Sequence, residues 1–216
     1  MKIVMVRHGQ TLSNVLNEEQ GITLFTGALN NEYTDLTDKG IMQAKSLTNL
    51  DIIKEIETVY CSDLDRAIQT AKLAKPGYNL NIDKRLRERS LGVFEGHNQD
   101  ILLENNEDRK YLDDENYKNF RNSFNQKAPN GESYTDVSNR AKDFLDSLDF
   151  SQNKTIGIFA HCHIIRCLFL NMLKIEPKEK ILRLKIKNCE PYIVEGNSID
   201  ELKLISHNMD DMYYEN

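Results

Sequence analysis

Three short apolar segments, each followed at once by polar or cationic residues and a helical pattern, constrain the fold of this chain most. They are KIVMV at 2–6, ETVYCS at 57–62 and TIGIFA at 155–160. Near-continuous apolar strands that alternate with helices are typical of a parallel sheet covered on both faces. We therefore expect an α/β fold, a three-layer sandwich with a mostly parallel central sheet and helices on both faces.

Capping signals indicate where the helices begin. In SDLDRAIQTAKLA, Ser62 is the expected N-cap, with Asp65 three residues on and apolar residues at helical spacing, so Arg66 lies near the first turn. The same Ser-x-x-Asp arrangement starts a second helix at Ser133, and Thr37 is the expected cap of an earlier one. Helices are thus predicted directly after the strands or between them.

The length of 216 residues suits a single domain over 1–216. Between about 98 and 127 the chain turns strongly polar, with scattered aromatic residues. We expect a peripheral helical insertion there, acting either as a cap or lid over a substrate or as a solvated helix with no substrate role. No repeat or low-complexity linker divides the chain.

The formal net charge of −6 argues against nucleic acid as a partner, because phosphate backbones require a basic face. The 4 cysteines show no C-x-x-C spacing and lie in or beside apolar segments, so we expect reduced, packed thiols. The N-terminal apolar run is too short for a signal peptide, and residues 156–173 include too many polar side chains to span a membrane. We expect a cytoplasmic protein with no membrane partner; the sequence does not indicate its oligomeric state.

Cationic and imidazole side chains follow all three predicted strands. Arg7 and His8 follow the first, Arg66 the second and His161 the third. Ligands of open parallel sheets bind beyond the carboxyl ends of the strands, so these side chains are expected in one crevice. A lone histidine there is more often structural, and a lone arginine is usually a surface ion pair. The repeated arrangement favours a tetrahedral oxyanion, because guanidinium N–H groups match phosphate oxygens.

A phosphomonoester in this crevice would give each group a role. His8 would attack phosphorus as a neutral imidazole and form a phosphohistidine. Arg7, Arg66 and protonated His161 would stabilise the charge on the equatorial oxygens, in place of metal ions.

The leaving alkoxide needs a proton, and the segment KRLRERSLGVFEG offers Glu88 and Glu95 as donors. Neighbouring arginines would lower the pKa of Glu88, whereas burial and a bound phosphate would raise it, so the sign stays open. The alternative is that Glu88 only pairs with those arginines.

The sequence His161-Cys162-His163 invites comparison with a metal site. On an extended segment the two histidines would share one face while Cys162 faces away. No second ligand pair with suitable spacing is evident, so we expect no metal. A redox pair of Cys162 and Cys167 is less favoured than simple packing.

Six segments, in order, resemble motifs of the histidine phosphatase superfamily, the phosphoglycerate mutase-like proteins. VRHGQTLSN is similar to the nucleophile motif, DLTDKGIMQA and SDLDRAIQTA to the two following helix starts, and LRERSLGVFEG to the acid loop. PNGESYTDVSNRAKDFL resembles the G-E-S stretch, and IGIFAHCHIIR the second-histidine motif. The G-E-S and acid-loop patterns look more like the phosphatase branch than the mutases.

This resemblance implies a phosphoglycerate mutase-like fold, with the nucleophile at the carboxyl end of a strand. It implies His8 as the phosphorylated nucleophile, Glu88 as the acid that later activates water, and a structural role for Glu95. No metal or organic cofactor is implied. The implied phosphate pocket consists of Arg7, Asn14, Arg66 and His161.

Two positions depart from the usual family pattern. Cys162 stands where the family usually has glycine after the second histidine, at a close backbone approach to phosphate. The loop between Asn14 and Asp35 is longer than usual, and Thr26 and Gly27 are its candidate substrate-binding residues, with the Gln-Gly pair at 20–21 as the alternative.

The leading prediction is a metal-independent phosphatase acting on a small phosphorylated substrate. A cofactor-dependent phosphoglycerate mutase is the first alternative, because it would use the same phosphohistidine. A non-catalytic phospholigand-binding module is the second, although such a module would be expected to lose the nucleophile or the acid. A phosphoprotein-directed phosphatase is the third.

Overall fold

A six-stranded sheet forms the centre of the computed structural model, which describes residues 1–100, 104 and 107–214. The strand order is β3-β2-β4-β1-β5-β6. The first four strands in this order run parallel, and β5 and β6 are antiparallel to their neighbours. The mostly parallel sheet is therefore confirmed, with strands β1 Lys2–Arg7, β2 Thr58–Cys61, β3 Leu80–Ile82, β4 Thr155–Ala160, β5 Pro191–Glu195 and β6 Lys203–Leu204.

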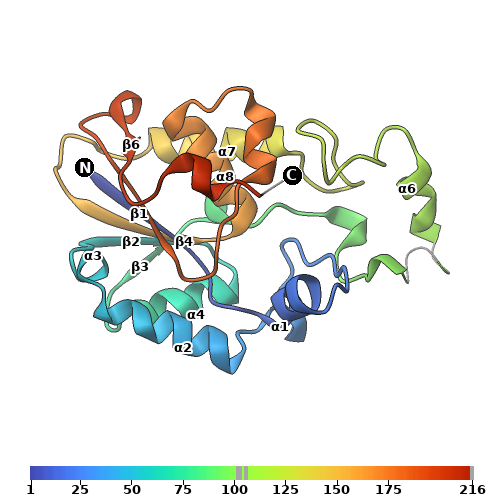
Figure 1. Ribbon diagram of the computed structural model, residues 1–216, viewed down its shortest axis with the longest axis horizontal. Helices are drawn as coiled ribbons and strands as arrows, with labels where there is room; N and C mark the ends of the chain where they lie inside the picture. Colours follow the sequence, from blue (N-terminus) through green and yellow to red (C-terminus); the bar gives the residue numbers. More distant parts are fainter. Residues whose placement is uncertain (101–103, 105–106, 215–216) are drawn as a thin grey trace.

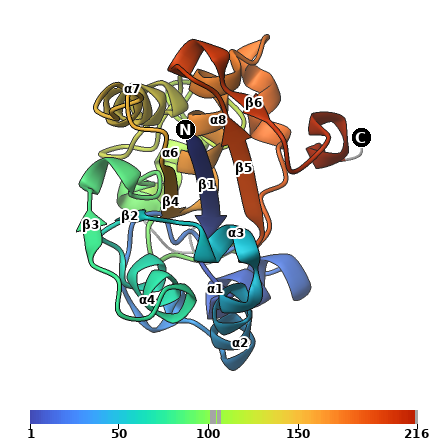
Figure 2. The ribbon, with the colours of Figure 1, turned by 90° about the vertical axis from the view of Figure 1, so that its left-hand side faces the viewer.

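Helices cover both faces of the sheet, as Figures 1 and 2 show. The lower layer in Figure 1 holds α2 Asp38–Ser46, α3 Asp51–Lys54 and α4 Asp65–Ala74. The upper layer holds α7 Tyr134–Asp146 and α8 Cys162–Leu173. The short helix α1 Leu12–Asn14 follows β1, so the three-layer prediction is also confirmed.

Successive side chains of β1 point alternately into the two halves of the core, one on each face of the sheet. Ile3 and Met5 are fully buried against the layer of α7 and α8, and Val4 and Val6 are fully buried against the layer of α4. The sequence of a strand that is buried on both faces is a continuous apolar run, because every residue faces one helix layer or the other. No helix in the described ranges is long and apolar enough to cross a membrane.

Two of the three predicted caps are confirmed. Thr37 accepts a hydrogen bond from the amide of Gly40 at the start of α2, and Ser133 forms a reciprocal capping box with Asp136 at the start of α7. The prediction for Ser62 is wrong, since α4 begins at Asp65 without a side-chain cap. The hydroxyl of Ser62 lies at the functional site instead.

The insertion predicted over 98–127 lies partly outside the described residues, because 101–103 and 105–106 are not among them. In its described residues the regular elements from 107 on are a 3-10 turn at Glu107–Arg109 and α6 Lys110–Asp113, followed by turns. Figure 1 shows this segment projecting away from the sheet, with α6 near its tip. Its inner end is anchored by Phe120, which packs against Phe25 and Phe94 in a small separate cluster.

Close backbone contact fixes the loop that follows β1. A Cβ atom on Gly9 would collide with the backbone of Gly40, and one on Gly40 would collide with the backbone of Gln10. The amide of Gly9 also donates to the hydroxyl of Thr70 on α4, 3.0 Å away. The residue that precedes Gly9 is thereby held at a fixed place at the end of the strand.

Candidate active site

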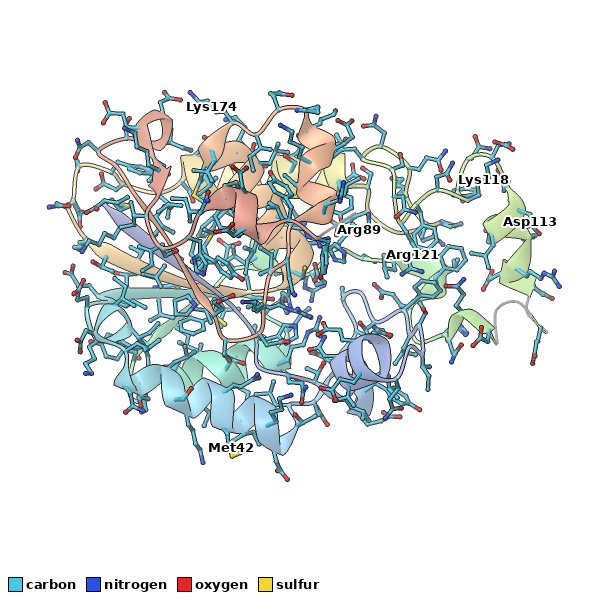
Figure 3. The ribbon with its side chains drawn as sticks, in the orientation of Figure 1. Met42, Arg89, Asp113, Lys118, Arg121 and Lys174 are labelled. Atoms are coloured by element: carbon cyan, nitrogen blue, oxygen red, sulfur yellow. The ribbon has the colours of Figure 1, made fainter. Side chains whose placement is uncertain are left out.

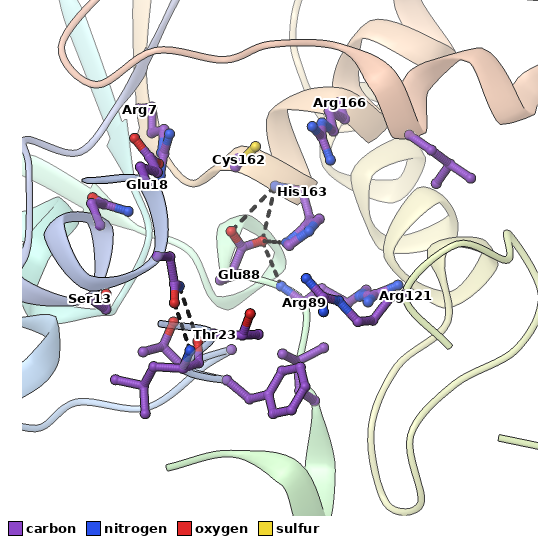
Figure 4. Close-up of a pocket in the computed structure, with 18 of the residues that line it drawn as sticks. Arg7, Ser13, Glu18, Thr23, Glu88, Arg89, Arg121, Cys162, His163 and Arg166 are labelled. Carbon is purple, nitrogen blue, oxygen red and sulfur yellow. Dashed lines mark hydrogen bonds and ion pairs between the residues drawn. The ribbon is translucent and has the colours of Figure 1, made fainter. Parts of the chain in front are cut away.

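A cavity of about 420 Å³ opens beyond the carboxyl ends of β1 and β4 (Figure 4). Its wall includes residues from the loop after β1, the start of α4, the segment 88–91 and the start of α8. The inner end of the insertion contributes residues 120–122. This is the crevice predicted from the strand ends. The predicted site residues on its wall are Arg7, His8, Asn14, Thr26, Gly27, Arg66 and Glu88.

His8 is buried, lies on the cavity wall and is held in one tautomer. Its Nδ1 lies 2.8 Å from the carbonyl oxygen of Gly9, and a carbonyl oxygen only accepts hydrogen bonds, so Nδ1 carries the proton. Burial, followed by the charges of Arg66 and Arg7, holds the pKa of His8 well below its usual range. Nε2 is therefore an unprotonated nitrogen with a free lone pair at neutral pH.

His161 lies directly behind His8, with ring centroids 5.2 Å apart. It is fully buried and is not on the cavity wall, and its Nε2 lies 2.8 Å from the hydroxyl of Ser62. Burial and the charge of Arg66 hold its pKa well below the usual range, so the protein alone favours neutral imidazole rather than the expected cation. Its buried Nδ1 has no hydrogen-bond partner in the part of the chain that the structure describes.

Arg7, the last residue of β1, is fixed by two contacts. Nη1 donates to the carbonyl oxygen of Ile186 at 2.8 Å, and Nη2 pairs with the Glu18 carboxylate at 3.2 Å. Its Nε is buried and has no partner among residues 1–100, 104 and 107–214. Glu18 comes from a turn of π-helix over Val15–Glu19 and also lies on the cavity wall.

Arg66 enters the cavity from the first turn of α4, as predicted. Its Nη1 and Nη2 donate to the carbonyl oxygens of Leu29 and Gly27, at 2.8 and 2.9 Å. Burial lowers the pKa of Arg66 to about 10, which leaves the guanidinium charged at neutral pH. Two cations therefore flank His8 from different strand ends.

Glu88 approaches the cavity beside the start of α8. Its carboxylate accepts backbone N–H groups from Arg89 at 2.8 Å and from His163 at 3.1 Å, and the Nδ1 atom of His163 lies 3.1 Å away (Figure 4). Burial by itself raises the pKa of Glu88, but the His163 side chain and the Arg89 amide beside the carboxylate outweigh it. The net pKa lies well below the usual range, which gives the sign that the sequence left open.

Asn14, Thr26 and Gly27 lie on the cavity wall, as the resemblance suggested. Asn14 Oδ1 accepts hydrogen bonds from the Thr11 amide and from Asn188 Nδ2, so its own NH₂ group is the part left for a ligand. Gly27 has a φ of +47°, and a Cβ there would collide with Glu95. A glycine is needed here for both reasons.

Glu95 is absent from the cavity wall and has the structural role expected for it. Its Oε1 accepts the amide N–H groups of Ala28 at 2.9 Å and Leu91 at 2.8 Å. This carboxylate therefore joins the loop that carries Gly27 to the segment that carries Glu88.

The extended conformation assumed for residues 161–163 is wrong, because α8 begins at Cys162. Cys162 and His163 both lie on the cavity wall, and His163 is paired with Glu88. The four cysteines are free thiols. No cluster of three or more metal-ligating side chains is found within 1–100, 104 and 107–214.

Several residues of the site were not predicted. Ser62 was assigned to a helix cap, and His163 was considered only for a metal. Three further arginines line the cavity, and their positions within ordinary helical or polar segments give no sequence signal. They are Arg89, Arg121 and Arg166, which Figure 4 shows on the other side of Glu88 and His163 from Arg7.

Comparison with known proteins identifies relatives of this chain. The sequence profile of the histidine phosphatase superfamily (branch 1) matches residues 3–207. An adenosylcobalamin/alpha-ribazole phosphatase of Salmonella typhimurium is 32% identical over 178 residues, which are 80% of this chain and 80% of the relative. A probable phosphoglycerate mutase of Erwinia tasmaniensis is 28% identical over 220 residues, 96% of this chain and 94% of the relative.

A solved structure has the same architecture. The crystal structure of the alpha-ribazole phosphatase from Shigella flexneri superposes with a TM-score of 0.76 at 27% identity, covering 96% of each chain. The fold therefore has a counterpart along nearly the whole chain.

Proposed function

Because this chain belongs to the histidine phosphatase superfamily (branch 1), we propose that it is a metal-independent phosphomonoester hydrolase. It acts on a small phosphorylated metabolite through a phosphohistidine at His8. The observation that carries the proposal is the state of His8, whose Nδ1 is bonded to the Gly9 carbonyl and whose pKa is strongly lowered. That state leaves Nε2 as a free nucleophile between Arg7 and Arg66.

In the first step Nε2 of His8 attacks phosphorus, the N–P bond forms and the ester P–O bond breaks. Arg7 and Arg66 balance the charge on the equatorial oxygens, which is the role that metal ions have in many phosphoryl-transfer sites. His161 stands behind His8, and its unpartnered Nδ1 is the donor we assign to a phosphoryl oxygen after it takes up a proton. A phosphate dianion would favour that protonation.

Glu88 is the group we assign to the leaving oxygen. Its pKa is low in the protein alone, so the proton must arrive with the substrate. A phosphomonoester bound as its monoanion carries one, because its second pKa is about 6. In the second step Glu88, now a carboxylate, takes a proton from water while the water oxygen attacks phosphorus. The N–P bond then breaks and phosphate leaves.

The test is phosphate release from 4-nitrophenyl phosphate in excess chelator, comparing wild type with His8→Ala and with His207→Ala as a histidine control outside the cavity. We expect chelator-resistant turnover by wild type and by the control, and none by His8→Ala. Acid-labile phosphate should be trapped on the wild type and on the control, but not on His8→Ala. Equal phosphate release by wild type and His8→Ala, or loss of activity in chelator, would overturn the proposal.

A second candidate is a cofactor-dependent phosphoglycerate mutase, favoured by the relative from Erwinia tasmaniensis that matches 96% of this chain. A mutase returns the phosphoryl group from histidine to a substrate hydroxyl instead of to water. Incubation with a phosphoglycerate isomer and its bisphosphate primer separates the two. The hydrolase releases inorganic phosphate, whereas the mutase interconverts the isomers.

A further inference from the structure

The cavity holds more positive charge than a phosphoryl group balances. Among the described residues, five arginines and two glutamates lie on its wall, an excess of three positive charges within that set, although the whole chain has a formal net charge of −6. A bound phosphate dianion compensates two of these at most. In the described part of the chain, the arginines that pair with carboxylates are Arg7, Arg85, Arg87 and Arg140. The cavity residues Arg89, Arg121 and Arg166 are not among them.

Arg89 and Arg166 meet at Tyr134, the first residue of α7. The Arg89 guanidinium carbon lies 4.4 Å from the centroid of the Tyr134 ring, and Arg166 Nη1 lies 3.3 Å from the Tyr134 hydroxyl. Both arginines are almost completely buried, at 2% and 7% exposure. Two buried cations are thus held together at one side of the cavity, and neither guanidinium forms an ion pair with a carboxylate of the described residues, which is costly unless an anion joins them.

Most N–H groups of these two guanidinium groups are not used by the protein. Arg89 donates from Nη1 to the Phe120 carbonyl, and its buried Nε has no partner in the described ranges. Arg166 donates from Nε to the Leu184 carbonyl and from Nη1 to Tyr134. Each guanidinium has five N–H donors, so several remain for a ligand.

The position of this cluster relative to the reacting groups indicates which part of a substrate would reach it. Glu88 and His163 lie between Arg7 and the arginines in Figure 4, and Figure 3 shows Arg89 and Arg121 where the insertion joins the body. Glu88 is the residue assigned to the leaving oxygen. The portion of the substrate beyond that oxygen therefore extends toward Arg89 and Arg166.

We propose that the substrate is a phosphomonoester with a second anionic group, a carboxylate or a phosphate, which binds Arg89, Arg166 and the Tyr134 hydroxyl. This second-anion subsite rests on the proposed function, because it places the phosphoryl group at His8. Guanidinium groups bind carboxylate and phosphate oxygens alike, so the experiment distinguishes the two.

The test uses pairs of substrates that differ in the second group alone. Glycerol 3-phosphate and 3-phosphoglycerate differ in a carboxylate, and fructose 6-phosphate and fructose 1,6-bisphosphate differ in a phosphate. We expect kcat/KM to favour the member that carries the second anionic group, in one of the two pairs, by about 10- to 100-fold. That preference should disappear in Arg89→Gln and shrink in Tyr134→Phe, which removes one oxygen atom and keeps the ring. The exposed Arg109→Gln, outside the cavity wall, removes the same charge and should keep the preference.

Binding provides a readout that does not depend on turnover. Calorimetry with His8→Ala should give tighter binding of the ester that carries the second anionic group than of its partner in the pair, and combining this variant with Arg89→Gln should abolish the difference. If wild type hydrolyses 4-nitrophenyl phosphate but shows no preference within either pair, the subsite is wrong and the proposed function stands. If no ester is hydrolysed but the binding difference is present, the subsite stands and the proposed function fails. A preference that survives Arg89→Gln with unchanged size overturns the subsite.

Discussion

Glu88 is a carboxylate that the protein itself stabilises in its charged form. Two backbone N–H groups and the neighbouring His163 lower its pKa, although burial acts in the opposite direction. An acid catalyst needs a proton when the ester bond breaks, whereas a base needs the carboxylate when water attacks. The environment of Glu88 therefore favours the carboxylate that accepts a proton from water in the second step. In the first step Glu88 can act as an acid only when the substrate brings a proton.

Glu88→Gln should keep the fold, because the amide oxygen still accepts the two N–H groups, but it should slow both proton transfers. We expect kcat for an alkyl phosphate to fall by about 10²- to 10⁴-fold. With 4-nitrophenyl phosphate, whose leaving group needs little acid help, a burst of nitrophenolate equal to the enzyme should precede a slow steady state. Rapid-mixing absorbance measures the burst, with the exposed Glu55→Gln as control. Full steady-state activity of Glu88→Gln would contradict this role.

The residues that escaped sequence reasoning were missed for identifiable reasons. Ser62 precedes a helix and has an acidic residue three positions on, which is the pattern of a cap. Its hydroxyl instead lies 2.8 Å from His161, a residue 99 positions away. His163 is two residues from a catalytic candidate, but only the start of α8 at Cys162 turns it toward Glu88.

At the scale of elements, polar contacts join the loop that carries Thr26 and Gly27 to two neighbouring segments. The Glu95 carboxylate accepts two amide N–H groups, one from this loop and one from the segment that carries Glu88. The same loop supplies the carbonyl oxygens that position Arg66. A residue off the cavity wall therefore supports a phosphate-binding side chain.

Glu95→Ala should lower the free energy of unfolding by about 1–3 kcal/mol, because two amide groups lose a charged acceptor. The KM for 4-nitrophenyl phosphate should rise, since the carbonyl partners of Arg66 become less well fixed. Urea denaturation and steady-state kinetics measure the two effects. Glu55→Ala, which removes a half-exposed ion pair with Lys2, is the control and should change neither. If Glu95→Ala has wild-type stability, the two hydrogen bonds to the Glu95 carboxylate do not stabilise the fold.

For the whole molecule, the active site makes stability dependent on pH. Burial is the main cause that lowers the pKa values of His8, His161 and His163 in the folded protein. In the unfolded chain these groups have the ordinary histidine pKa of about 6.5. Between the two values the unfolded chain binds protons that the folded protein does not. The free energy of unfolding is therefore highest above pH 6.5 and falls as the pH decreases.

We expect urea denaturation to show this loss between pH 7.5 and 5.5, the range chosen to span the pKa of an ordinary histidine. Each proton taken up on unfolding contributes a slope of about 1.4 kcal/mol per pH unit. Replacing His161 by Asn should reduce the slope. A low Glu88 pKa adds to the loss only at lower pH, where the unfolded carboxyl, at about 4.3, becomes protonated. Stability that does not change between pH 7.5 and 5.5 would contradict neutral, buried histidines.

The sequence by itself determined three of the six strands, the starts of α2 and α7 and the meeting of Arg7, His8 and Arg66 at one edge of the sheet. These features depend on local periodicity, on capping and on the rule that the carboxyl ends of parallel strands lie at the same edge of a sheet. Each can be recognised from a short segment of sequence. Tertiary structure alone decided the rest. Whether Glu88 is charged, whether His161 touches the cavity and which cations reach Tyr134 depend on burial and on neighbours far away in the chain, because desolvation and Coulomb interactions act through space.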